Sequence, residues 1–128
     1  MFRFTSVIAL LAVASCTQAP SATDLANADF GSQISRSKCQ RIAKGQILPM
    51  LKDPNSAQLL FGKCEKRSLG SIPIAGIPIQ YGYLIVASVN AKNSYGGYGG
   101  AKNWETLINN GQVIRRTAPS SDGFQLPY

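Results

Sequence analysis

Along the pattern of apolar and polar positions, the middle of the chain carries the strongest run of strand-forming side chains. Residues 80–89 combine aromatic and β-branched side chains at strand spacing, and these favour a central β-strand. Residues 58–68 predict an earlier strand in which Leu60 and Cys64 share a face. Residues 103–108 and 112–117 flank Asn109-Asn110-Gly111, and Asn and Gly tolerate the positive φ of a tight hairpin.

A helix is expected from about Ser35 to Leu51, with Ser35 or Ser37 as its N-cap. Spacings of three and four place apolar side chains on one face of this helix. Those side chains are Cys39, Ile42, Ala43, Ile47, Met50 and Leu51. Gly45 and Pro49 weaken the pattern and favour a kink or an earlier end. Asp53-Pro54 then indicates a new short turn, with Pro54 at its first position.

These elements predict an α+β fold in which an N-terminal helix packs on a small antiparallel sheet of three to five strands. The chain is long enough for one domain, which we place at residues 36–117, followed by a loose tail at 118–128. Residues 69–79 contain Pro and Gly and cannot form a regular central strand. Their isoleucines either cover an edge of the core or form an exposed contact patch.

The N-terminus begins with Met1-Phe2-Arg3 and continues into the apolar run Val7 to Ala14. This run is too short to span a bilayer and is typical of the apolar region of a secretory signal. Val13-Ala14-Ser15-Cys16 then resembles the lipobox of bacterial lipoproteins. The resemblance implies that residues 1–15 are removed and that Cys16 carries the lipid. The alternative is ordinary signal cleavage after Ala14, which gives a secreted protein without lipid.

Residues 16–35 are rich in small and polar side chains and are expected to be the lipid anchor and tether. Phe30 and Ile34 are the members of this stretch expected to pack on the domain. The residue after the anchor is Thr17. In the Gram-negative sorting pattern an Asp there retains a lipoprotein in the inner membrane, so Thr17 indicates the outer membrane, facing the periplasm.

The chain has three cysteines, an odd number for an exported protein. Lipidation of Cys16 leaves Cys39 and Cys64 to form a disulfide between the helix and the first strand. They are too far apart for a Cys-x-x-Cys motif, which argues for a structural bond over a redox-active pair.

Composition narrows the function classes. The chain contains no histidine, which excludes Ser-His-Asp and Cys-His pairs and histidine-containing zinc sites. No two acids lie close in sequence, and we expect no catalytic residues, no metal and no cofactor. An enzyme or inhibitor acting on envelope polymers is the alternative. Its only polar candidates near one another are Lys92, Ser94 and Glu105.

The chain has 13 basic and 6 acidic side chains; without Arg3 of the signal, the net charge is 12 − 6 = +6. Such a charge serves solubility or attracts anionic partners. The basic residues are scattered and form no nucleic-acid reading motif, which argues against nucleic acid as a partner.

Two segments resemble the signature of a family of small exported bacterial proteins and lipoproteins. The first is Leu-Lys-Asp-Pro-Asn-Ser-Ala at Leu51 to Ala57, and the second is Val-Asn-Ala-Lys-Asn-Ser-Tyr-Gly-Gly-Tyr at Val89 to Tyr98. The resemblance covers about residues 39–108. It implies a related fold and export, but no reaction.

The second segment has two interpretations. In the structural one, its asparagines and glycines form turns and its tyrosines pack on the sheet. In the functional one, it is a binding surface for an envelope protein or a cell-wall polymer, since it presents charge, amide and aromatic groups. The residues of that surface are Asn90, Lys92, Asn93, Tyr95 and Tyr98. The oligomeric state is left open.

Overall fold

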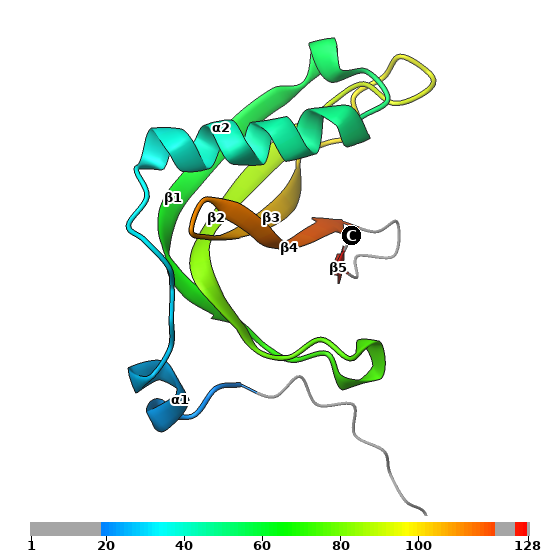
Figure 1. The fold of residues 1–128 in the computed structure, drawn as a ribbon. Helices are drawn as coiled ribbons and strands as arrows, with labels where there is room; N and C mark the ends of the chain where they lie inside the picture. The colour runs from blue at the N-terminus through cyan, green and yellow to red at the C-terminus, as the bar shows by residue number, and fades with distance from the viewer. Residues whose placement is uncertain (1–18, 120–124, 128) are drawn as a thin grey trace, which may run out of the picture.

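The computed structural model describes residues 19–119 and 125–127. Their main feature is a curved antiparallel sheet whose strands follow one another in chain order (Figure 1). Its strands are β1 (Gln58–Leu69), β2 (Gln80–Asn90), β3 (Lys102–Asn109), β4 (Gln112–Pro119) and β5 (Gln125–Pro127). The helices are α1 (Ala22–Ala26) and α2 (Arg36–Ile47), with short 3-10 turns η1 (Leu48–Met50), η2 (Pro54–Ser56) and η3 (Pro73–Ala75).

The α+β class expected from the sequence is wrong. The described residues are mostly β, with four long strands and a three-residue β5, and α2 is a single helix of 12 residues. The first helix, α1, has five residues and buries none of them, so within residues 19–119 no extended N-terminal helical layer covers the sheet. The helix expected to reach Leu51 ends at Ile47. Pro49 has no backbone N–H to donate, and in a continuing α-helix its ring would clash with the carbonyl group one turn earlier.

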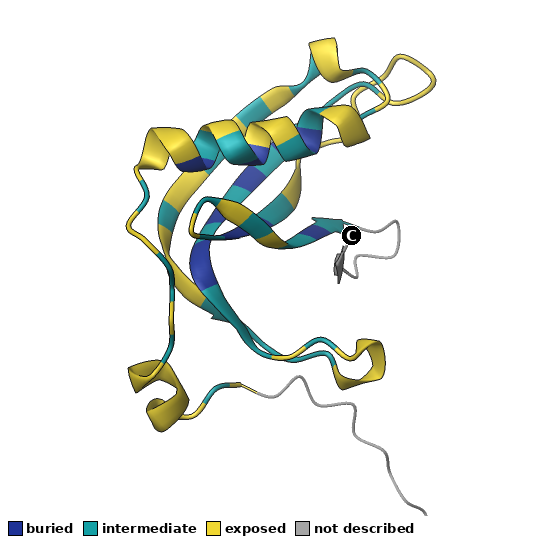
Figure 2. Cartoon of the chain, viewed as in Figure 1, coloured by how far each residue is buried: buried dark blue, intermediate teal, exposed yellow. Residues whose placement is uncertain are grey.

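The core lies between α2 and one face of the sheet (Figure 2). Alternate residues of β2 point to this face, and Ile85 and Ala87 are fully buried. Ile108 of β3 joins them, together with Cys39, Ala43 and Ile47 of α2. These three positions of α2 are spaced by four residues, so they form one stripe along the helix.

The predicted disulfide between Cys39 and Cys64 is confirmed. It joins α2 to β1 with 6.3 Å between the two Cα atoms. Cys39 is completely buried, and Cys64 lies opposite Ile85 in the sheet. The bond therefore fixes the helix against the centre of the core.

The hairpin expected at Asn109-Asn110-Gly111 is present between β3 and β4. Asn110 has φ +50° and Gly111 has φ +75°. A two-residue turn with both φ values positive has a backbone twist that matches the twist of the two strands it joins. Ser32 of the preceding segment donates to Asn110 Oδ1 from both its N and its Oγ, each at 2.8 Å. The turn thus also holds the chain that enters α2.

Part of the segment expected as a tether is held against the sheet. Asn109 Nδ2 donates to Asp29 O at 2.9 Å, and Phe30 meets Tyr81 edge-on with 5.6 Å between the ring centroids. Ile34 packs against the core cluster. The chain is therefore fixed from residue 29 onward, and the expected signal at 1–15 and Cys16 lie outside the described residues.

The sheet bends enough for β4 to contact Gly70, just after β1, and Gln80, at the start of β2. Arg115 Nη1 donates to Gly70 O at 2.7 Å, and Gln80 Nε2 donates to Ile114 O at 3.2 Å. Residues 125–127, part of the tail expected to be loose, pair with β4 as β5. These contacts close the sheet partly upon itself (Figure 1).

Candidate functional site

The two signature segments, separated along the chain, are in direct contact. Lys92 N donates to Ser56 Oγ at 2.9 Å, and Tyr98 OH donates to Ser56 O at 3.0 Å. The Ser56 hydroxyl in turn donates to Asp53 O at 2.8 Å, closing the turn at η2. One serine of the first segment therefore holds both ends of the loop formed by the second.

The loop is closed by its own backbone. Lys92 and Tyr98 form an isolated β-bridge, and Asn93 N donates to Gly97 O at 2.9 Å. Asn93 Oδ1 accepts from Tyr95 N at 2.9 Å and from Gly97 N at 3.2 Å. The left-handed Gly96, with φ +77°, allows the chain to reverse between them. The amide of Asn93 therefore has a structural role in the loop.

A cleft of about 280 Å³ lies beside this loop. Three lysines from three places in the chain line it: Lys52 from the first segment, Lys92 from the loop and Lys102 from the start of β3. Trp104 lines it too, with Met50 and Leu51 among the apolar side chains. We call the group Lys52, Lys92, Lys102 and Trp104 the lysine cleft.

The register of the sheet and the loop contacts bring the lysines together. Lys102 lies opposite Val89 in the β2–β3 pair, and Val89 also lines the cleft. Lys92 is held by Ser56, four residues after Lys52. No Asp or Glu is among the described residues that line the cleft, and none of the three lysines forms an ion pair within the described part of the chain. The cleft therefore concentrates positive charge next to an aromatic ring.

The residues of the predicted binding surface are not all brought together. Lys92 and Asn93 line the cleft, whereas Tyr95 is 96% exposed and does not. Tyr98 supports the loop through Ser56, with the Lys92 ammonium 5.9 Å from its ring centroid. Asn90 lines a separate hollow with Leu60 and Ser88, on the opposite face of β2 from Val89.

Sequence reasoning missed Lys52, Lys102 and Trp104. Lys52 is the second residue of the first signature segment, and its place in that segment was the available signal. Nothing in the sequence indicated Lys102 or Trp104, because their proximity to Lys92 depends on strand register.

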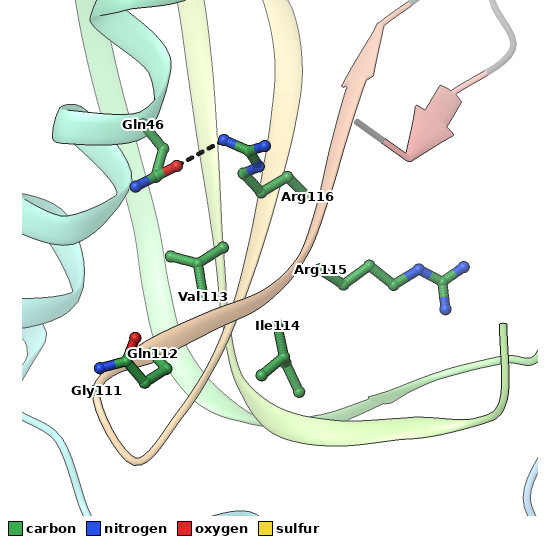
Figure 3. Close-up of a pocket in the computed structure, with 7 residues that line it drawn as sticks. All are labelled: Gln46, Gly111, Gln112, Val113, Ile114, Arg115 and Arg116. Atoms are coloured by element: carbon green, nitrogen blue, oxygen red, sulfur yellow. Dashed lines mark hydrogen bonds between the residues drawn. The ribbon is translucent and has the colours of Figure 1, made fainter.

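A larger cavity, of about 440 Å³, lies between α2 and β4 (Figure 3). Its lining is mostly the strand itself, residues 111–116, with Gln46 from the helix. Arg116 Nη1 donates to Gln46 Oε1 at 2.6 Å, while Arg115 points to the other side of β4. Burial lowers the pKa of Arg115, and the nearby Glu105 carboxylate partly offsets this. Both arginines form hydrogen bonds within the fold, to Gln46 and to Gly70. Because their guanidinium groups already have these partners, this cavity is the weaker candidate site.

The polar side chains of the enzymatic alternative are not assembled. Glu105 does not line the lysine cleft; its Oε2 accepts from Thr117 Oγ1 at 2.9 Å. Neighbouring residues of a strand point to opposite faces, so Glu105 and Trp104 face apart. Within the described residues, no three Cys, Asp or Glu side chains lie close enough to hold a metal ion.

Comparisons of the chain with protein families, with curated proteins and with solved structures found no match. None of the described helices has the length and apolar character required to cross a membrane.

The contact between the two segments predicts unequal effects for two tyrosine substitutions. Tyr98→Phe removes only the hydroxyl that donates to Ser56 O, and we expect a loss of about 1 kcal/mol in the free energy of unfolding. Tyr95→Phe is the matched control, because Tyr95 is almost fully exposed, and we expect a change within about 0.5 kcal/mol. Urea denaturation of both variants measures this difference. Equal effects would contradict a stabilising hydrogen bond from Tyr98 to Ser56.

Proposed function

We propose that this is an exported cell-envelope protein, lipid-anchored at Cys16, whose domain binds an anionic component of the envelope without catalysis. The observation that carries the proposal is that Ser56 joins the two signature segments at the lysine cleft. Segments that are only structural have no need to bring three lysines to one cleft whose described lining holds no acidic side chain, since like charges repel one another.

The chemistry of the cleft favours a ligand with carboxylates. Lysine ammonium groups donate up to three hydrogen bonds each, and such bonds to carboxylates are stronger than neutral ones. The indole of Trp104 and the aliphatic stems of the lysines add apolar contact area. We propose the peptide-bearing polymer of the cell wall as the ligand, because it combines carboxylates with less polar groups along one chain.

The proposed location in the cell envelope agrees with the disulfide of the domain. Disulfides persist in oxidising compartments such as the periplasm and are rare in the cytosol. The Cys39–Cys64 bond therefore supports export. The lipobox-like Val13 to Cys16 supports the anchor, and Thr17 supports an outer-membrane location facing the periplasm.

The test is sedimentation of the protein with isolated peptidoglycan. A variant with Lys52→Gln, Lys92→Gln and Lys102→Gln is expected to bind about tenfold more weakly, because three favourable charge contacts of modest strength are lost. The matched control carries Lys38→Gln, Arg41→Gln and Lys44→Gln, which remove the same charge from exposed positions of α2. The control is expected to bind like the wild type.

The control distinguishes the cleft from general electrostatic attraction. Equal weakening in both triple variants would show that net charge alone drives binding. Wild-type protein that does not sediment with peptidoglycan would contradict the proposed ligand.

A further inference from the structure

The connection between β1 and β2 is a compact and wholly uncharged tip. Residues 69–79 contain no Lys, Arg, Asp or Glu. Ile72 and Ile77 pair across the tip, with Ile72 N donating to Ile77 O at 2.7 Å and Ile77 N donating to Ile72 O at 3.1 Å. Between them, η3 and the left-handed Gly76, with φ +66°, complete the reversal. The tip therefore has a fixed backbone.

This backbone presents an isoleucine to solvent. Ile74 is 95% exposed, while Ile72, Ile77 and Ile79 are half-buried. Single exposed apolar side chains are common on proteins and need no explanation by themselves. Here, however, the side chain stands at the end of a closed turn, flanked by the exposed Pro73 and Ala75. The sequence left two roles open for this loop, and the geometry of Ile74 favours contact over covering.

The tip lies at the end of the molecule from which the chain leads to Cys16. In Figure 1, η3 and α1 are both at the lower end, whereas the loop after β2 that borders the lysine cleft is at the upper end. The chain is fixed to the sheet at Asp29 by Asn109. Position 29 follows position 16 by only 13 residues, a reach of at most about 45 Å even if fully extended. A lipid on Cys16 would therefore hold Asp29 no farther than this reach from the bilayer, and this end of the molecule is the one nearest the anchor along the chain.

We propose that the tip inserts Ile74 into the interface of the membrane that holds the lipid of Cys16. The inference rests on the proposed anchor. Lys66 lies on β1 near this end, with its ammonium 5.7 Å from the centroid of the Phe30 ring. An apolar tip at the same end of the sheet as an exposed lysine suits an interface with anionic lipids, whose attraction adds to apolar burial.

Membrane contact at the tip sets the orientation of the domain. With the tip and the anchor at one surface, the molecule stands on that membrane, and the loop that borders the lysine cleft lies at the opposite end. An anchored protein in this orientation reaches a cell-wall polymer with its binding end.

The test places a tryptophan at the tip of the full lipidated protein. Ile74→Trp is compared with Leu60→Trp, since Leu60 is 75% exposed on β1 opposite Ser88, near the other end of the sheet. Both are reconstituted into phosphatidylethanolamine–phosphatidylglycerol vesicles with and without doxyl-labelled lipid. The wild type supplies the signal of Trp104, the natural tryptophan. We expect Trp emission at position 74 to shift to the blue and to be quenched several-fold more than at position 60.

Each other outcome overturns a stated part of the inference. Mass spectrometry of the same samples reports the lipid on Cys16. A lipidated protein whose signal at position 74 is quenched no more than at position 60 overturns the membrane contact and leaves the anchor intact. A blue shift without quenching would place the tip against protein, which also overturns it. A chain without lipid on Cys16 overturns the anchor and the contact together.

Discussion

Replacing both cysteines of the disulfide, with Cys39→Ala and Cys64→Ala together, is expected to lower the free energy of unfolding by about 3.5 kcal/mol. The bond closes a sequence separation of 25 residues, and opening it restores chain entropy to the unfolded state. Small domains are stable by only about 5–15 kcal/mol, so the loss is a large share of the total. Alanine avoids placing a hydroxyl at the completely buried position 39.

Urea denaturation measures this loss, and a reductant provides the control. Reduced wild-type protein should unfold at nearly the same urea concentration as the double variant, and the reductant should leave the variant unchanged. Since Ala43 and Ile47 still pack on Ile85, we expect the variant to fold. Equal stability of the variant and the oxidised wild type would contradict a stabilising role for the bond.

The second large effect is expected at Gly82 in β2. A Cβ atom there would lie 2.5 Å from the carbonyl oxygen of Ile108 and 3.3 Å from a methyl carbon of Leu107. The first contact is with backbone, so β2 and β3 would have to separate where the sheet bends. We expect Gly82→Ala to cost about 3 kcal/mol, the upper part of the range for overpacked cores.

Gly62→Ala on β1 is the matched control. Its Cβ would meet only the Val86 carbonyl oxygen at 3.4 Å, an ordinary contact. Alanine also restricts the unfolded chain, so the control is expected to be neutral or slightly stabilising. Thermal denaturation of the two variants measures the contrast, and similar melting temperatures would show that β2 and β3 are not closely packed at Gly82.

The local elements were predictable where short-range chemistry determines them. The aromatic and β-branched side chains of residues 80–89 predicted β2, although which of its faces is buried is seen only in the structure. The tight turn follows from Asn110 and Gly111, whose positive φ values few other residue pairs adopt. The odd number of cysteines led to the Cys39–Cys64 pairing.

The fold class was not predictable in the same way. Apolar spacing extended the helix to Leu51, whereas Pro49 ends it, and the 3-10 turn η1 takes over the last apolar residues. The Ser, Pro and Gly residues after position 117 led us to expect a loose tail, whereas β4 continues to Pro119 and pairs with β5. Strand pairing at the end of a chain depends on the partner strand, which a local pattern does not contain.

The candidate site was likewise predictable only in part. The loop at Lys92 and Asn93 was recognisable as a candidate from its composition. The lysine cleft was not, because it depends on the register that sets Lys102 opposite Val89 and on the hydrogen bond from Lys92 to Ser56. Both are contacts between residues far apart in the sequence, so the spacing of residues along the chain does not predict them.

In the proposed function, Cys16 carries the lipid that places the domain at the envelope. Metabolic labelling with an alkyne fatty acid tests it most directly, in cells that express the wild type or Cys16→Ala. We predict label on the wild-type protein in the membrane fraction and none on the variant. Unlabelled wild-type protein, or equal label on both proteins, would contradict the account.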